Sequence, residues 1–236
     1  MPMIPYMQFD ADLAAIGRVL ADPHRAAILM ALLGGEELAA GELGLRARAS
    51  SSLASAHLSK LLEAGMIDVR PDGRQRYYRV ASDQVAQAIE GLMAIAPTRR
   101  VSSLREARQG EAIRQARTCY DHLAGRLGVA VTEALRDSGA LRPSDSGWEL
   151  TADGEMRFTQ LGIDVAHLRV QRRPLVRACL DWTERRPHLA GGLGAALAAR
   201  LLERGWIRRL PNSRAVSLTA AGRRGLRSQL ALQLPS

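Results

Sequence analysis

The chain has 236 residues, of which 47% are hydrophobic and 24% are charged. This length and balance are enough to bury the cores of two small domains, and they exclude an intrinsically disordered chain. The formal net charge is +9, and the whole basic excess lies in residues 101–236. Because all but one of the 33 basic residues are arginine, charge alone is weak support for an acidic partner.

Composition also narrows the compartment and the class of partner. Aromatic residues make up only 4% of the chain, which argues against a protein that stacks the bases of single strands. No apolar run reaches membrane-spanning length, and residues 1–13 lack the basic stretch of a signal peptide. We therefore expect a cytoplasmic protein with no membrane partner, whose two cysteines are thiols and not a structural disulfide.

Two helices are expected in the segment before residue 46. Within Leu20–Leu33, Asp22 suits the N-cap and Pro23 suits the first helical position. The apolar residues that follow recur on one helical face, and Gly34-Gly35 ends the helix. Glu36–Leu45 then predicts a second, shorter helix.

A third helix is expected over Ser51–Glu63, ended by Gly65. Its apolar stripe consists of four leucines: Leu53, Leu58, Leu61 and Leu62. The opposite face carries short hydroxyls and one cation, at Ser51, Ser52, Ser55, Ser59 and Lys60. Side chains of this size and chemistry suit a helix that lies in the major groove of DNA.

A β-hairpin is expected directly after this helix. Met66–Arg70 predicts a strand, Pro71–Gly73 a turn and Gln75–Val80 the return strand. Four arginines decorate the hairpin, at positions 70, 74, 76 and 79. Helix and hairpin together indicate a recognition helix with a wing that reaches phosphates, and the alternative is an ordinary surface hairpin after an amphipathic helix.

At this point the chain resembles the ArsR family of bacterial winged-helix transcription regulators. The resemblance covers about residues 8–95, and it rests on five stretches taken together: Leu20-Ala-Asp-Pro-His-Arg25, Gly41-Glu-Leu43, Ser52–Leu58, Leu62-Glu-Ala-Gly65 and Asp72–Arg79. It implies a winged helix-turn-helix domain over residues 8–96 that binds DNA and dimerises. By the same resemblance, dimerisation belongs to a first helix at about Gln8–Leu20 and a last helix at about Asp83–Ile95.

The resemblance implies a transcriptional regulator, a repressor that an effector releases from DNA. It implies a homodimer that places two recognition helices on an inverted-repeat operator in double-stranded DNA. The residues expected to contact DNA are Ser51, Ser52, Ser55, Lys60, Arg74 and Arg76, with His57 at the border of this face.

Two departures from the family concern its metal sensors. Many members carry a Cys-x-Cys pair on the helix before the recognition helix, whereas here Leu38–Leu43 holds neither a thiol nor an imidazole. The other site of the family lies on the last helix of the domain, and Asp83–Ile95 contains no histidine. An effector must therefore act elsewhere, and we expect a linker at 97–109 followed by a sensing domain at 110–236.

The region 110–236 contains an internal repeat. His122-Leu-Ala-Gly125 returns as His188-Leu-Ala-Gly191, and Leu-Thr-Ala-x-Gly occurs at 150–154 and again at 218–222. Each copy predicts a helix, a strand, a turn, a return strand and a helix capped by threonine. We therefore expect two degenerate winged-helix-like repeats, at about 117–165 and 177–230, in a protein that is mostly α with small β wings. Their helices, Leu123–Leu135 and Leu189–Leu201, are apolar and favour a buried role over DNA contact.

Each repeat supplies one cysteine and one histidine: Cys119 and His122, then Cys179 and His188. The first pair is expected at i and i+3 on one helix, where both side chains face one ion. This set predicts a sensing site for a metal ion, a thiol-reactive oxidant or a small molecule, and the sequence leaves the metal and any cofactor unknown. In the alternative the four are core residues, and Asp121 and Asp181 pair with Arg117 and Arg177.

No Ser-His-Asp arrangement, phosphate loop or paired-carboxylate motif stands out, so we predict that the protein is not an enzyme. The alternative function is a ligand-binding or scaffold protein with a vestigial winged helix. Binding to the chain's own upstream DNA separates the two, because only the regulator binds it with an affinity that falls steeply with salt.

Overall fold

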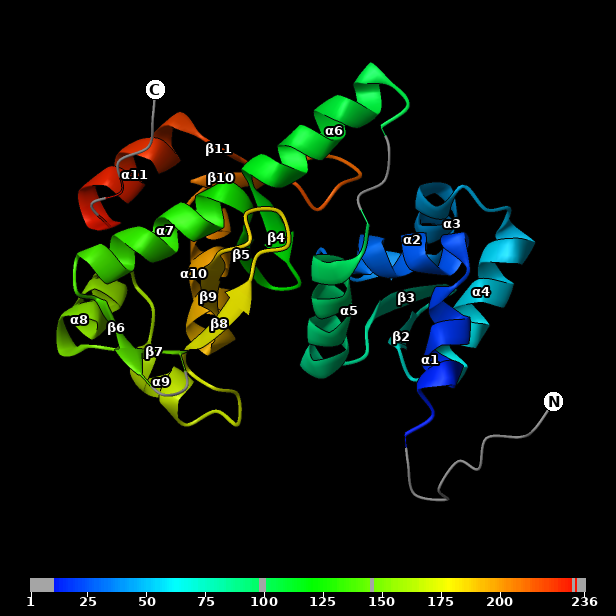
Figure 1. Ribbon diagram of the computed structural model, residues 1–236, viewed down its shortest axis with the longest axis horizontal. Coiled ribbons are helices and arrows are strands. Elements are labelled where there is room, and N and C mark those ends of the chain that lie inside the picture. Colours follow the sequence, from blue (N-terminus) through cyan, green and yellow to red (C-terminus); the bar gives the residue numbers. More distant parts are fainter. Residues whose placement is uncertain (1–10, 98–100, 145–146, 231, 233–236) are drawn as a thin grey trace. The chain divides into compact units, whose positions relative to one another are not determined.

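The structure is a computed structural model that describes residues 11–97, 101–144, 147–230 and 232 (Figure 1). By their contacts these residues form two compact units. The first consists of the chain up to Leu32 together with Glu36–Ser82, and the second of Leu33–Gly35 together with the chain from Asp83 onward. None of the described helices combines the length and the apolar character needed to cross a bilayer.

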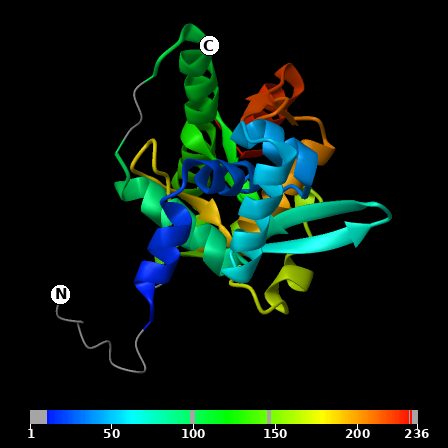
Figure 2. The same cartoon turned by 90° about the vertical axis from the view of Figure 1, so that its right-hand side faces the viewer.

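The first unit packs four helices against a small antiparallel sheet. Its elements are α1 (Leu13–Leu20), α2 (Pro23–Leu32), β1 (Leu38–Ala39), α3 (Ala40–Ala47), α4 (Ser51–Glu63), β2 (Ile67–Asp72) and β3 (Gln75–Val80). The strand order is β1-β3-β2, and the tip of the β2–β3 hairpin projects beyond α4 (Figure 2). Leu29, Leu43, Leu58 and Leu61 are fully buried between the helices. This is the winged helix-turn-helix that the sequence predicts.

Local side-chain chemistry sets the helix starts of this unit. The Asp22 carboxylate accepts hydrogen bonds from the N–H groups of His24 and Arg25, directly before Pro23 begins α2. Ser50 Oγ accepts the N–H of Leu53 at the start of α4. The predicted bounds of α4, Ser51–Glu63, are confirmed. They could be predicted because the residues that start and end the helix lie within one turn of its ends.

Two details of the first unit differ from the prediction. Pro71 and Asp72 pair with Arg76 and Gln75, so the strands run further and the turn tightens to Gly73-Arg74. The segment predicted as a helix from Glu36 begins instead as β1, because Leu38 pairs with Tyr78 of β3, and the helix starts at Ala40. Residues 8–10 of the predicted first helix lie outside the described residues.

The second unit alternates helices with two-stranded hairpins. Its elements are α5 (Asp83–Ile95), α6 (Leu104–Gln115), β4 (Arg117–Cys119), β5 (His122–Ala124), α7 (Gly125–Asp137), β6 (Leu141–Ser144), β7 (Gly147–Leu150), α8 (Ala152–Gln160), α9 (Val165–Arg169), β8 (Arg177–Leu180), β9 (Pro187–Ala190), α10 (Gly191–Glu203), β10 (Ile207–Arg209), β11 (Val216–Leu218) and α11 (Ala220–Leu230). The hairpins are β4–β5, β6–β7, β8–β9 and β10–β11.

Helices α7 and α10 supply the core of this unit. Leu127, Leu135, Leu193 and Leu201 belong to one buried hydrophobic cluster together with Phe158 of α8. Both helices therefore have the buried, apolar role that the sequence predicts for them. The winged-helix character of the two repeats stays a prediction.

The hairpins also change where the helices begin. We predicted helices from Leu123 and from Leu189, but those residues are in β5 and β9, and the helices start two residues later at Gly125 and Gly191. Both glycines have a left-handed backbone, with φ of 76° and 84°. A Cβ added there would lie 2.6 Å from the Arg114 carbonyl oxygen and 2.7 Å from that of Pro174, so each helix start is packed against backbone.

The connection between the units also differs from the sequence boundaries. Helix α6 begins at Leu104, inside the predicted linker 97–109, with Ser103 as its N-cap. Helix α5 groups by contacts with the second unit, whereas the sequence places it in the N-terminal domain. The buried ion pair between Glu90 of α5 and Arg214, at 2.6 Å, is one reason for this grouping. Residues 98–100 of the linker, and residues 145–146, 231 and 233–236 of the C-terminal region, lie outside the described residues.

Candidate functional site

The exposed face of α4 carries the polar residues that the sequence assigns to DNA contact. Ser51, Ser52, Ser55 and Lys60 are all exposed, while Leu58 and Leu61 on the other side are buried. The Ser55 hydroxyl donates to the carbonyl oxygen of Ser51, so it lies along the helix surface. Leu53, which the sequence predicts in the apolar stripe, is 40% exposed and places an apolar side chain on this face.

The arginines of the β2–β3 hairpin differ in whether they have a carboxylate partner. Arg70 pairs with Glu37 at 2.8 Å and Arg79 with Asp68 at 3.4 Å. Arg74 and Arg76 are exposed, and neither has an ion-pair partner among the described residues. These two are also the arginines of the hairpin that the sequence assigns to DNA contact, and that role stays a prediction.

His57 does not lie where the sequence predicted. Its side chain is buried, with the ring stacked on His24 at 5.3 Å between centroids and Nδ1 3.7 Å from an oxygen of Asp22. The helical period turns position 57 to the same side as Ala54, Leu58 and Leu61, which face the core. The expectation that His57 borders the exposed polar face is therefore corrected.

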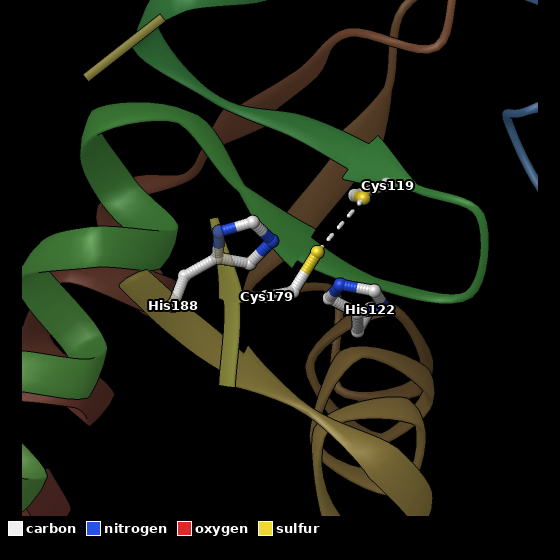
Figure 3. A group of neighbouring side chains, drawn as sticks. All are labelled: Cys119, His122, Cys179 and His188. Atoms are coloured by element: carbon white, nitrogen blue, oxygen red, sulfur yellow. Dashed lines mark hydrogen bonds between the residues drawn. The ribbon is translucent and has the colours of Figure 1, made fainter. Parts of the chain in front are cut away.

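The two cysteines and two histidines of the repeats come together in the second unit (Figure 3). Cys119 lies directly opposite His122 across β4–β5, and Cys179 directly opposite His188 across β8–β9. One ligand atom from each of the four lies within 4.8 Å of the others. The structure brings together the four residues that the sequence grouped. The predicted helix for Cys119 and His122 is wrong, because the two are cross-strand partners of a hairpin and share one face of it.

The two imidazoles of the cluster are buried, and most of their described nitrogens have no hydrogen-bond partner. His122 is 2% exposed and His188 is 0% exposed, and the rings stack at 5.0 Å between centroids. Among the described residues, Nε2 of His122 and both ring nitrogens of His188 have no hydrogen-bond partner. A buried polar atom without a partner costs about 1–3 kcal/mol, so these nitrogens need an occupant or neighbour to be satisfied.

A carboxylate lies near Nδ1 of each histidine of the cluster. Oδ1 of Asp121 lies 3.2 Å from Nδ1 of His122, and Arg173 holds Asp121 from the other side. Oδ2 of Asp181 lies 3.7 Å from Nδ1 of His188 and 3.0 Å from Nη2 of Arg117, and the side chains of this second group are fully buried. The repeat thus places an Asp–Arg pair beside each imidazole.

These partnerships differ from the pairing weighed in the sequence. Arg117 pairs with Asp181 of the other repeat, and Asp121 pairs with Arg173. Arg173 had no signal in the sequence, since it lies outside the repeated Arg-x-Cys-x-Asp block. The repeat itself identified Asp121 and Asp181, and only the contact between the two hairpins shows that the pairing crosses from one to the other.

The surroundings of the cluster shift the pKa values of the two thiols, of His122 and of Asp121. The hydrogen bond between the two sulfurs, which are 3.9 Å apart, raises the pKa of Cys119 and lowers that of Cys179. Burial disfavours a charged His122, but the Asp121 carboxylate at its Nδ1 and the nearby sulfur of Cys179 outweigh it and raise its pKa. Burial likewise opposes ionisation of Asp121, yet hydrogen bonds from His122 and Arg173 lower its pKa to about 2.

A small cavity lies beside the cluster within the second unit. It is lined by Ala86 and Glu90 of α5 together with Cys119, His122 and Cys179. The helix that follows the wing in the chain therefore lines the same cavity as three residues of the cluster.

Comparison with known proteins agrees with the N-terminal architecture. A model of a helix-turn-helix domain matches residues 20–70. YdfF of Bacillus subtilis, an uncharacterized HTH-type transcriptional regulator, is 45% identical over 212 residues, which are 90% of this chain and 94% of YdfF. The chain belongs to the family of HTH-type transcriptional regulators.

Further relatives match the N-terminal domain of this HTH-type regulator. The biofilm growth-associated repressor of Agrobacterium fabrum is 36% identical over 39% of this chain and 79% of its own length. The homodimeric winged helix-turn-helix domain Mb0332 of Mycobacterium bovis, described as a possible ArsR-family regulator, is 28% identical over 38% of this chain and 89% of its own, with a TM-score of 0.33. The transcription regulator expected from the sequence is confirmed at the level of the HTH-type family.

Proposed function

We propose that this HTH-type regulator is a homodimeric repressor that binds an inverted-repeat operator and leaves it when an effector binds in its C-terminal region. The observation that carries the DNA-binding part is the exposed polar face of α4, followed by a wing whose Arg74 and Arg76 are free of carboxylate partners among the described residues. The name of the A. fabrum relative supports repression. The role is regulation in the cytoplasm and not catalysis.

The roles of the individual residues follow from their chemistry. Serine hydroxyls at positions 51, 52 and 55 donate to or accept from base edges and phosphates, and Lys60 contacts phosphate as a point charge. Arg74 or Arg76 reaches the backbone beside the major groove. His57 is left out because it is buried.

Helix α1 supports the homodimer. It has no buried residue, and Leu13 and Ile16 are 78% and 37% exposed. An apolar helix face of this kind is stable in water when another surface covers it, and a second copy of the chain supplies that surface in a two-fold dimer.

The effector part of the proposal rests on α5. This helix follows β3 with only two residues between them, lines the cavity beside Cys119 and is tied to Arg214 by Glu90. A ligand that alters the packing around Cys119, His122, Cys179 and His188 therefore acts on α5 directly. A coupling free energy of about 1–3 kcal/mol is enough to change DNA affinity roughly 5- to 150-fold.

Binding of the full-length chain to a duplex from its own upstream region tests the proposal. We expect specific binding whose affinity falls steeply with salt. Arg74→Ala should weaken binding to specific and unrelated duplexes alike and lower the salt slope by about one ion, because a phosphate contact carries no sequence information. Arg208→Ala removes an equal charge from an exposed site on β10 and should change neither quantity.

Two results would count against this assignment. If Arg74→Ala affected only the specific duplex, Arg74 would contact bases and not phosphate. If the chain bound no duplex even at low salt, the second candidate would be favoured, a ligand-binding or scaffold protein with a vestigial winged helix. The absence of net positive charge in residues 1–100 is the feature of the chain that fits that candidate.

A further inference from the structure

We propose that Cys119, His122, Cys179 and His188 form a closed, four-ligand site for one divalent metal ion of the zinc class. Two thiolates and two imidazoles in tetrahedral arrangement are the ligand set that zinc and its chemical relatives prefer, whereas magnesium and calcium prefer oxygen ligands. Ion binding itself stands independently of DNA binding. Only the identification of the ion as the effector rests on the proposed function.

The spacing of the sulfurs fits such an ion. With metal–sulfur bonds of about 2.3 Å, a tetrahedral centre holds two sulfurs roughly 3.8 Å apart. The sulfurs of Cys119 and Cys179 are 3.9 Å apart, and the four candidate ligand atoms lie within 4.8 Å of one another. Small rotations of the imidazoles are therefore enough to complete the coordination.

The orphaned nitrogens supply a second, independent observation. Both rings flank the sulfur of Cys179 (Figure 3), and Nε2 of His122 and of His188 are buried with no hydrogen-bond partner among the described residues. A metal ion bound between the two rings and the sulfurs would satisfy these lone pairs.

Asp121 is placed as a metal-ligating histidine requires. A histidine that binds a metal usually donates its other N–H to a carboxylate, which fixes the tautomer and the ring orientation. Nδ1 of His122 faces Asp121 at 3.2 Å, which leaves Nε2 for the ion. Oδ2 of Asp181 lies 3.7 Å from Nδ1 of His188, too far for a hydrogen bond, but it is on that side of the ring and leaves Nε2 for the ion.

The charges balance around a divalent ion. Binding releases the protons of the thiols, so two S–H bonds are replaced by two metal–sulfur bonds and the two thiolates neutralise the ion. Arg117 and Arg173 neutralise the two carboxylates behind the histidines. All four coordination positions are taken by the chain, so the site holds the ion without an open position for a substrate.

Within the second unit, the cluster is connected to Leu33 and Gly34. On either side of Cys119, the hydroxyl of Thr118 donates to the carbonyl oxygen of Gly34 at 3.1 Å and the N–H of Tyr120 donates to that of Leu33 at 2.8 Å. Tyr120 has a left-handed φ of 59° in the turn between Cys119 and His122. An ion that tightens this turn therefore acts on Leu33 and Gly34.

Titration of the full-length chain with Co²⁺ tests the site. The chain is reduced, freed of metal with a chelator and kept without DNA. We expect uptake of one ion per chain, with the strong visible and near-ultraviolet absorption of tetrahedral cobalt with thiolate ligands, and displacement by Zn²⁺. Cys179→Ser and His188→Gln should lose this spectrum, while His167→Gln, which changes an exposed histidine of α9, should keep it.

A measurement on the unmodified chain tests the site even if the variants fail to fold. Saturation with Zn²⁺ should protect both cysteines from an alkylating reagent, because a metal-bound thiolate is no longer free to react. Unchanged alkylation rates, or cobalt uptake that survives in Cys179→Ser and His188→Gln, would overturn the site. So would a reduced chain that takes up no cobalt yet joins Cys119 to Cys179 by a disulfide on treatment with a hydroperoxide, which would make the pair a thiol switch.

The effector role has a separate readout. Saturating Zn²⁺ should weaken binding of the chain to its operator at least fivefold, and His188→Gln should remove this response. Cobalt uptake by a chain that binds no DNA would refute the proposed function and leave the metal site standing. DNA binding by a metal-free chain that takes up no cobalt would refute the site and leave the proposed function standing.

Discussion

At the scale of the residue, the capping carboxylate of Asp22 links sequence, stability and pH. The hydrogen bond from the Arg25 N–H is the largest cause that lowers the pKa of Asp22, followed by nearby positive charge. A carboxyl whose pKa is lower in the folded chain stabilises the fold above its unfolded pKa of about 3.9, and it loses that effect as the pH falls through the folded pKa.

We therefore predict that Asp22→Ala lowers the free energy of unfolding by about 1 kcal/mol at pH 7, because the first turn of α2 loses its cap. The difference from the unmodified chain should shrink as the pH falls below about 4, where its own carboxyl becomes protonated. Urea denaturation of both chains across this range measures it. Asp22→Asn, which keeps a capping oxygen, should lose less, and an equal loss in both variants at every pH would contradict the capping role.

At the scale of the element, the starts of α7 and α10 show how a helix is fixed by its surroundings. Gly125 begins α7 in a left-handed conformation against the Arg114 carbonyl oxygen, directly after the β4–β5 hairpin that holds Cys119 and His122. Its N–H also donates to Asp181 at 2.7 Å. The glycine thus ties the helix start to the buried ion pair between Arg117 and Asp181.

We predict that Gly125→Ala lowers the free energy of unfolding by about 1–3 kcal/mol, because alanine disfavours positive φ and its Cβ would meet backbone that has no room to move. Gly110→Ala is the matched control. A Cβ at position 110 on α6 meets nothing within 4 Å, and φ is not in the left-handed region. Thermal or urea unfolding should find the control unchanged or stabilised by up to about 1 kcal/mol. Equal effects of the two substitutions would contradict the packing described here.

At the scale of the whole molecule, the exposed apolar face of α1 predicts the oligomeric state. Light scattering at micromolar concentration should give the mass of two chains, and Leu13→Lys should shift the population towards one. As the dimer is lost, the affinity for the operator should fall too, because a two-fold complex needs both recognition helices. A monomeric unmodified chain would contradict the dimer, and Lys substitution of the exposed Leu180 on β8 should leave the mass unchanged.

The two units also predict separate effects on binding and on release. Replacing Cys119 and Cys179 together by Ser should leave operator binding of the metal-free chain intact, because neither residue belongs to the unit that carries α4. The same variant should no longer release DNA when Zn²⁺ is added. Normal release by the double variant in a DNA-binding assay would show that the cysteines are core residues only.

The sequence by itself determined the elements that local interactions control. The signals for α4, α2 and the strand Gln75–Val80 are local: the leucines of α4, Asp22 and Pro23 of α2, and the turn before Gln75. They act within one or two turns or across one hairpin, so these elements are readable from neighbouring residues. The repeat likewise pointed to Cys119, His122, Cys179 and His188. Tertiary structure alone decided how these four meet, because cross-strand register and contacts between residues about 60 positions apart leave no local pattern. The same holds for the burial of His57 and for the pairing of Arg117 with Asp181, since each depends on packing between elements that are distant in the chain.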